Sequence, residues 1–340
     1  MISYDNTTLV PKDQAIPSDI VHRADCDTSV EFCGVKLSVP MIASPMHDVC
    51  NGVMAETLVR LGTMGIIHRF QTVEEQVSEF KRAAIIGWPY QVACAVGVVG
   101  DYEVRFANLY NAGCRIFCLD TANGANRQVG TALEKIKLVA GSILSNQDRF
   151  YLIAGNIATA AGYEYLADCG VDAVRVGIAG GSVCETKTET GIYLPTLESV
   201  RRCDKERNRL YNLHRGRQLP LIIADGGIRT PSDMNKALAV GADVVMCGSA
   251  FAGTAEAPGE EWNDEGTLRK LFRGSASFGV QKHMNGEEPD YVEGREKSVK
   301  YKGHIAGVIK RFRGGLQSSM SMCNAKTITA YRNNVIVEVL

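Results

Sequence analysis

The chain has 340 residues, 45% of them hydrophobic, and its 37 basic residues nearly balance 38 acidic ones, for a formal net charge of −1. Because a nucleic-acid-binding surface needs a clustered basic face, this even balance argues against nucleic acid as a partner. Neither a signal peptide nor a run of about 18 apolar residues is visible, so we expect no secretion and no membrane span. Eleven cysteines without CxxC spacing indicate free thiols in a reducing, cytoplasmic compartment.

Short apolar runs that end in small or polar residues recur along the chain and predict eight parallel strands. In chain order they are Val39–Met46, Met64–Arg69, Gln91–Val98, Arg115–Ala122, Tyr151–Ile157, Ala173–Ile178, Leu221–Gly227 and Val244–Ala250. Helical patterns lie between several of them, at Val73–Ile86, Tyr102–Ala112, Ala160–Cys169 and Pro231–Val240. Gly113, Gly170 and Gly241 are each expected to end a helix in a left-handed conformation just before a strand. The alternation predicts an α/β protein with one (β/α)8 TIM barrel over residues 1–340.

Polar and glycine-rich residues follow the predicted strands, at the end of a barrel where active sites are found. These positions are 47–48, 68–69, 120–124, 155–156, 177–184, 225–227 and 248–249. Burying polar groups at so many strand ends is costly unless they serve a ligand. We therefore expect a ligand-binding site at the carboxyl ends of the strands.

The loop at 177–184 ends in Cys184, which follows a flexible polar stretch instead of lying inside an apolar run. Nearby positive charge or backbone N–H groups would favour its thiolate, but these residues alone leave an inert buried cysteine as an alternative. Asp225-Gly226-Gly227 and Gly248-Ser249 end the last two strands, where backbone N–H groups commonly bind phosphate. Ordinary turns are the alternative there, and Asp225 is expected to accept hydrogen bonds from ribose hydroxyls.

Taken together, 177–184, Ala224–Ile228, Gly248-Ser249 and Gly314-Gly315-Leu316 resemble the IMP dehydrogenase and GMP reductase family. The resemblance extends over nearly the whole chain. It implies a (β/α)8 barrel, usually assembled as a homotetramer, in which Cys184 attacks C2 of a purine nucleotide. A nicotinamide cofactor then exchanges a hydride at that carbon.

Three features place the resemblance closest to GMP reductase. The segment from His68 to Glu74 runs straight from strand to helix, without the regulatory CBS insert of most dehydrogenases. A flap expected at about 276–300 lacks the Arg-Tyr pair with which dehydrogenases activate water. Thr186 and Glu293 match the residues with which reductases move protons to the leaving amine. The implied reaction is the NADPH-dependent conversion of GMP to IMP and ammonia.

The resemblance also implies roles for further residues. Nucleotide contacts would come from Ser182, Asp225, Gly226, Gly227, Gly248, Ser249, Arg273, Gly274 and Ser275. Contacts to NADPH, or alternatively NADH, would come from Asp120, Thr121, Ala122, Asn123 and Gly124. The carbonyl oxygens of Gly177, Gly181 and Cys184 match a potassium site of the family, and such oxygens suit a hard monovalent cation.

The chain also departs from the family. Ala179-Gly180-Gly181 replaces a Gly-Pro-Gly sequence. Asp290 and Gln317 each replace an arginine, and the loss of these positive charges alters the expected binding of the nucleotide or cofactor. Residues 253–259 are closer to the dehydrogenases. Three alternatives therefore stay open: an IMP dehydrogenase without its CBS domain, a non-catalytic purine-nucleotide-binding regulator, and an enzyme for dGMP or a modified purine nucleotide.

Overall fold

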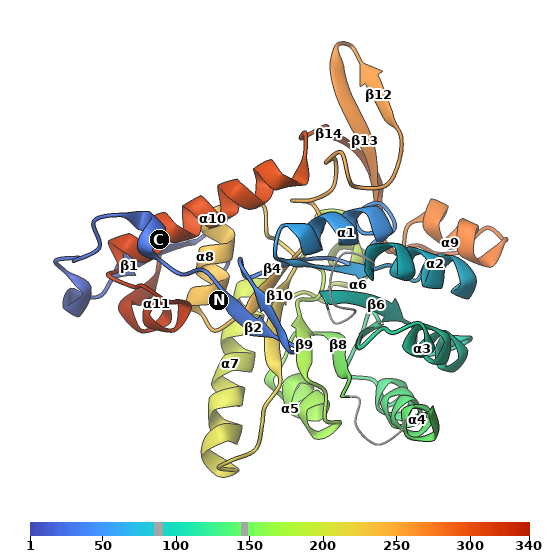
Figure 1. The fold of residues 1–340 in the computed structure, drawn as a ribbon, viewed down its shortest axis with the longest axis horizontal. Coiled ribbons are helices and arrows are strands. Elements are labelled where there is room, and N and C mark those ends of the chain that lie inside the picture. Colours follow the sequence, from blue (N-terminus) through green and yellow to red (C-terminus); the bar gives the residue numbers. More distant parts are fainter. Residues whose placement is uncertain (85–90, 144–148) are drawn as a thin grey trace.

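Eight parallel strands close into a barrel in the computed structural model, which describes residues 1–84, 91–143 and 149–340 (Figure 1). The strand order around the barrel is β10-β11-β4-β5-β6-β7-β8-β9. Their bounds are β4 (Met41–Ala43), β5 (Met64–Ile67), β6 (Val92–Val96), β7 (Ile116–Asp120), β8 (Tyr151–Ile157), β9 (Ala173–Val176), β10 (Leu221–Asp225) and β11 (Val244–Cys247). Each lies within one of the predicted apolar runs, so the predicted barrel is confirmed.

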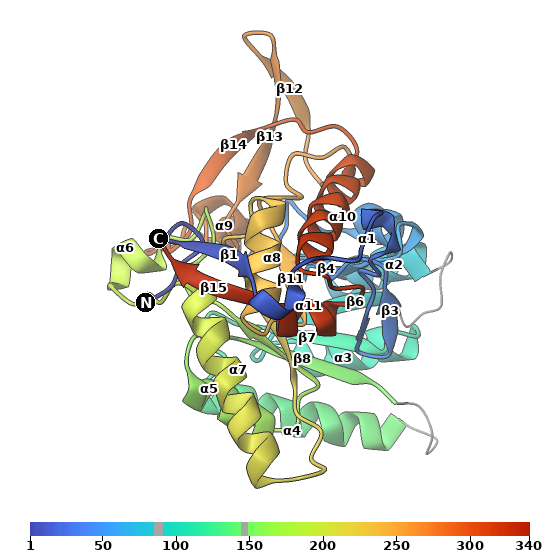
Figure 2. The same ribbon diagram turned by 90° about the vertical axis from the view of Figure 1, so that its left-hand side faces the viewer.

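Helices surround the barrel, as the two views in Figures 1 and 2 show. They are α1 (Gly52–Arg60), α2 (Val73–Ala84), α3 (Tyr102–Asn111), α4 (Arg127–Ile143), α5 (Ala160–Asp168), α7 (Thr196–Leu213) and α8 (Pro231–Ala239). The last two residues of the helix predicted at Val73–Ile86 lie outside the described residues. Gly113, Gly170 and Gly241 have φ angles of 107°, 71° and 114°, which confirms the predicted left-handed ends of three helices.

A hairpin that the sequence pattern did not predict packs against the amino ends of the barrel strands. It consists of β2 (Val30–Phe32) and β3 (Val35–Leu37). Phe32 and Leu37 are fully buried in one cluster with residues inside the barrel, such as Ile116 and Ile223. This cluster fills the barrel from its amino end, so the carboxyl ends of the strands are left to form a site.

A second unpredicted feature is an antiparallel sheet that projects from the barrel (Figure 1). It contains β12 (Glu261–Asp264), β13 (Thr267–Arg273) and β14 (Glu296–Lys300). The expected flap at 276–300 is made of α9 (Phe278–Asn285), a connecting segment and β14. The short helix α6 (Thr186–Thr190) follows the loop that carries Cys184.

The two ends of the chain pair with each other. The C-terminal segment at 301–340 contains α10 (Ile305–Met322), α11 (Ile328–Asn334) and β15 (Val335–Val339). Strand β15 runs antiparallel to β1 (Thr7–Pro11), and two short 3-10 helices, η1 (Asp13–Ala15) and η2 (Arg23–Asp25), follow β1. Residues 1–11 are thereby attached to the outside of the barrel.

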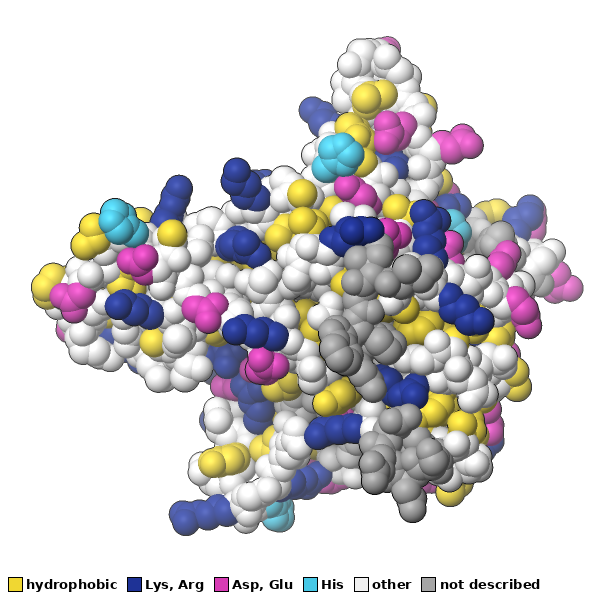
Figure 3. Space-filling view, viewed as in Figure 1, with side chains coloured by type: hydrophobic (Ala, Val, Ile, Leu, Met, Phe, Trp, Pro, Cys, Tyr) yellow, Lys and Arg dark blue, Asp and Glu magenta, His cyan; other side chains and the backbone are white. Residues whose placement is uncertain are grey.

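Basic and acidic side chains are interspersed over the face shown in Figure 3. Among the described residues, no helix is both long enough and apolar enough to cross a lipid bilayer.

Candidate active site

A cavity of about 710 Å³ lies at the carboxyl ends of the barrel strands, and this volume is typical of a small-molecule site. Most residues predicted to take part in catalysis or to bind substrate, cofactor or cation line it. They are Asp120, Thr121, Ala122, Gly177, Gly181, Ser182, Cys184, Thr186, Asp225, Gly226, Gly227, Gly248, Ser249, Gly274, Ser275 and Glu293. The cavity is also lined by Ser44, Met46 and the segment Ser3–Asp5.

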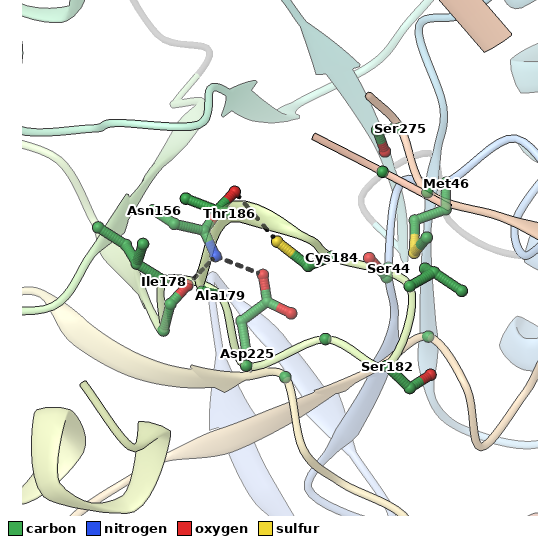
Figure 4. Close-up of a pocket in the computed structure, with 18 of the residues that line it drawn as sticks. Ser44, Met46, Asn156, Ile178, Ala179, Ser182, Cys184, Thr186, Asp225 and Ser275 are labelled. Atoms are coloured by element: carbon green, nitrogen blue, oxygen red, sulfur yellow. Dashed lines mark hydrogen bonds between the residues drawn. The ribbon is translucent and has the colours of Figure 1, made fainter. Parts of the chain in front are cut away.

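Cys184, Thr186 and Glu293 form a continuous hydrogen-bonded line in this cavity. The Cys184 thiol donates to Thr186 Oγ1 over 3.3 Å, and the Thr186 hydroxyl donates to Glu293 Oε2 over 2.7 Å. Figure 4 shows the thiol and the hydroxyl facing one another, with Ser182 farther along the same loop. All three side chains are half-buried. The arrangement can pass a proton between a nucleophile and a carboxylate.

Backbone pairing holds the Cys184 loop against the segment that carries Glu293. The Glu185 N–H donates to the Glu293 carbonyl over 2.8 Å, and the Arg295 N–H donates to the Val183 carbonyl over 3.0 Å. The Arg295 guanidinium also contacts the Glu185 carboxylate. Two segments more than 100 residues apart in sequence are thus fixed side by side, which places Thr186 between the thiol and the carboxylate.

The environment of Cys184 differs from that of most other cysteines. Nine of the eleven are buried, and only Cys169 and Cys184 are partly exposed. Burial raises the pKa of Cys118 and that of Cys203 to about 12, so these thiols stay protonated at neutral pH. Cys184 is the cysteine that lines the cavity beside a hydrogen-bonding partner. This favours the interpretation of Cys184 as a nucleophile over that of an inert core residue.

A network of largely buried side chains joins the ends of β7, β8, β9 and β10. Arg175 donates to Asp120 Oδ1 over 2.6 Å and to Asp225 Oδ2 over 2.9 Å, and Asn156 Nδ2 donates to Asp225 Oδ2 over 2.8 Å. Burial would raise the pKa of Asp120, but the charges of Arg175 and Arg69 outweigh it and lower that pKa. Asp225 Oδ1 makes no hydrogen bond to a described residue, so it can accept one from a ligand.

Arg175 was not expected in the site, and Asn156 was expected there only as one of the polar positions 155–156. Both have a visible signal, because Asn156 interrupts the apolar run Tyr151–Ile157 and Arg175 interrupts the apolar run Ala173–Ile178. A charge inside a predicted parallel strand is expensive without partners, and here the partners are Asp120 and Asp225.

Arg273, which was expected at the nucleotide, lies outside the cavity lining. Its guanidinium contacts Asp48, with Nε–Oδ2 and Nη2–Oδ1 distances of 2.8 and 2.6 Å, and lies 3.0 Å from His47 Nδ1. The residue does not line the cavity, because the Asp48 carboxylate holds its side chain elsewhere. Arg273 is thus engaged with Asp48 and His47, and a contact with the nucleotide stays a prediction.

Two of the residues expected at the cofactor also lie outside the cavity lining. Asn123 is exposed, and its side-chain oxygen accepts a hydrogen bond from the N–H of Ala125 over 3.1 Å. Gly124 is buried against the backbone of 155–156 and donates to the Asn156 carbonyl over 2.7 Å. Both residues shape the loop after β7, while Asp120, Thr121 and Ala122 face the cavity.

Two of the three carbonyl groups expected at the potassium site, those of Gly177 and Gly181, accept hydrogen bonds within the protein. The Gly177 carbonyl accepts from Asn156 Nδ2 over 2.7 Å, and the Gly181 carbonyl accepts from the Cys184 N–H over 3.2 Å. In the described part of the chain, no three His, Cys, Asp or Glu side chains cluster in a way that could hold a metal ion. Each carbonyl oxygen has a second lone pair, so the potassium site stays a prediction, and we assign no chemical step to it.

Comparison with known proteins identifies both GMP reductases and IMP dehydrogenases as relatives of this chain. GMP reductases from Staphylococcus carnosus and Chromobacterium violaceum are each 32% identical, over 98% and 99% of this chain and 94% and 98% of their own lengths. The inosine-5′-monophosphate dehydrogenase of Nitrosopumilus maritimus is 39% identical over 72% of this chain, which spans 50% of that relative's length.

The model of the IMP dehydrogenase / GMP reductase domain matches residues 1–339. That match covers the barrel, the Cys184 loop and the segment with Glu293. The chain belongs to the IMP dehydrogenase / GMP reductase family, whose members are oxidoreductases that act on purine nucleotides.

Proposed function

We propose that this protein is a GMP reductase, which converts GMP to IMP and ammonia with NADPH through a covalent bond between Cys184 and the purine C2. The observation that carries the proposal is the line Cys184–Thr186–Glu293, with its distances of 3.3 and 2.7 Å. It joins a nucleophile to a proton carrier, which is what the expulsion of an amine requires.

The reaction begins with a proton transfer along this line. The Cys184 thiol gives its proton to the Thr186 hydroxyl while that hydroxyl gives its own proton to the Glu293 carboxylate. The resulting thiolate adds to C2 of the purine. The net charge of the site does not change in this step, because the negative charge moves from the Glu293 carboxylate to the Cys184 sulfur.

Glu293 then returns a proton in the opposite direction. Protonation of the exocyclic nitrogen makes it a good leaving group, so ammonia departs and C2 stays bonded to Cys184. A hydride that adds to C2 lets the carbon–sulfur bond break, which yields IMP and the thiolate again. Thr186 thus takes part both in the deprotonation of Cys184 and in the protonation of the leaving amine.

The residues near Asp120 fit a nicotinamide cofactor. The cavity extends from Cys184 to Asp120 and Thr121, and Arg69 and Phe70 form part of the same wall. Arg69 Nε lies 3.5 Å from Asp120 Oδ2, so the two side chains form an ion pair on this wall of the cavity. When bound there, reduced nicotinamide supplies the hydride for C2.

Reduction is favoured over dehydrogenation by the segment that faces Cys184. A dehydrogenase must activate water for hydrolysis, and residues 276–300 hold no Arg-Tyr pair for this task. What contacts Thr186 in that segment is the carboxylate of Glu293. The two reductase relatives, which match nearly full length, support the same choice.

The test is the absorbance of NADPH in the presence of purified protein and GMP, with Cys184→Ala as the control variant. GMP-dependent loss of absorbance with IMP as product, in wild type alone, is the expected result. XMP formed from IMP and NAD would instead establish a dehydrogenase, and tight GMP binding without turnover would establish a regulator. Parallel assays with NADH in place of NADPH, and with dGMP in place of GMP, identify the preferred cofactor and the preferred sugar. The molecular mass in solution tests the expected homotetramer.

A further inference from the structure

Two lysines approach the end of the cavity at which Ser182 and Ser249 lie. Lys297 Nζ, from β14, donates to Ser182 Oγ over 2.8 Å and to the Ser182 carbonyl over 3.3 Å. Lys302 Nζ contacts the carbonyl of Ser249 and that of Ala250, the latter over 3.4 Å. Each lysine therefore holds one of the two serines that are expected to bind phosphate.

No acidic side chain balances these two charges. In the described part of the chain, the partners of both ammonium groups are serine and backbone oxygens, and neither forms an ion pair with a carboxylate. Burial and the charge of Arg295 lower the pKa of Lys297. Burial and the charge of Lys297 lower that of Lys302 to about 8. This end of the cavity thus carries an excess of positive charge that an anion would neutralise.

The ammonium of Lys297 lies behind the cavity wall and not inside it. It is 5.7 Å from the centre of the Phe272 ring, and Phe272 and Ser182 both line the cavity whereas Lys297 does not. Because Lys297 donates to Ser182 Oγ, the hydrogen of the Ser182 hydroxyl can turn toward a ligand. Lys297 is therefore a positioning residue that acts through Ser182 and through its charge.

We infer that Lys297 is a positioning residue for the phosphate end of the nucleotide: acting through Ser182 and through its charge, it strengthens binding of the 5′-monophosphate but not of the uncharged nucleoside. The inference rests on the proposed function in that a purine nucleotide occupies this cavity. The lysines contribute positive charge, while the serine hydroxyls and the glycine N–H groups of the neighbouring loops donate hydrogen bonds that orient the phosphate. A hydrogen bond to a charged group changes binding by about tenfold or more, so we expect an effect of that size.

The experiment compares Lys297→Met with the matched control Lys300→Met by calorimetric titration with GMP and with guanosine, without cofactor. Lys300 lies on the same strand, but it belongs to the exposed residues in the alternating pattern of β14. We expect Lys297→Met to weaken GMP binding about tenfold or more and to leave guanosine binding unchanged. Lys297→Arg should restore most of the affinity, and Lys300→Met should match wild type.

Two outcomes would overturn the inference. An equal loss of GMP and guanosine affinity in Lys297→Met would mean that the lysine only maintains the loop. Unchanged GMP affinity in that variant would mean that its charge is not used. Since the titration needs no turnover, Lys297-dependent GMP binding by a protein that does not oxidise NADPH would refute the proposed reductase and leave the inference standing.

Discussion

Replacing Thr186 with valine tests the proton path most directly. Valine keeps the branched shape of threonine but has no hydroxyl, so both hydrogen bonds, of 3.3 Å to Cys184 and 2.7 Å to Glu293, are lost together. General acid–base catalysis typically contributes about 10²–10⁴ in rate, so we expect kcat for GMP to fall by about 10² or more. Thr186→Ser keeps the hydroxyl and should retain activity within about tenfold.

The loss of rate should far exceed the loss of stability. Thr186 and Glu293 are both half-buried, so solvent can replace the missing hydrogen bond and unfolding should become easier by only about 1 kcal/mol. Stopped-flow measurement of ammonia release, with thermal unfolding beside it, separates the two effects. A Thr186→Val enzyme that releases ammonia at the wild-type rate, or a Thr186→Ser enzyme that is equally inactive, would refute the relay.

Three further predictions concern the support of the site. Charge reversal of either Glu185 or Arg295 should lower kcat by a few-fold, and the double reversal should restore it; absence of rescue in steady-state assays would show that their ion pair does not position the loop. Gly177→Ala should unfold at lower temperature and lose GMP binding, because a Cβ there would lie 1.9 Å from the Asp225 carbonyl oxygen; a wild-type melting temperature would contradict this. Burial alone would raise the pKa of Glu198, but hydrogen bonds from two arginines and a backbone N–H lower it to about 2. Its stabilising effect is therefore present above the unfolded pKa near 4.5 and is lost as pH falls toward 2, so Glu198→Gln should flatten acid unfolding in that interval; identical acid-unfolding curves would refute it.

The barrel strands could be predicted because each is buried on both faces. A run such as Val92–Val96 is apolar at every position, and this signal does not depend on its neighbours. The projecting sheet offers no such signal, since all four residues of β12 are exposed. The sheet is completed by β14, whose Lys300 pairs with Arg269 of β13, and a local pattern cannot reveal a partner so far along the chain.

The same distinction, between a local signal and a partner far along the chain, applies to the residues of the site. Cys184 and Thr186 are two residues apart, so one motif predicted both. Arg273 was assigned to the nucleotide from its place in a motif, but its partner Asp48 lies 225 residues earlier, and their ion pair decides where the guanidinium points. Lys297 carries no local signal either, because its importance comes from the position of Ser182.

The pairing of β1 with β15 determines when the cavity can be completed during synthesis. Thr7 pairs with Val339, so the first strand of the chain finds its partner only after residues 335–339 have left the ribosome. Strand β1 follows Ser3–Asp5, which line the cavity, and the Tyr4 ring packs against Gly227. The barrel can therefore form earlier, and Lys236 Nζ can then already donate to the Tyr4 carbonyl, whereas the ladder between β1 and β15 forms last. A nascent chain halted before β15 would hold the wall beside Gly227 by the contacts of residues 2–5 alone.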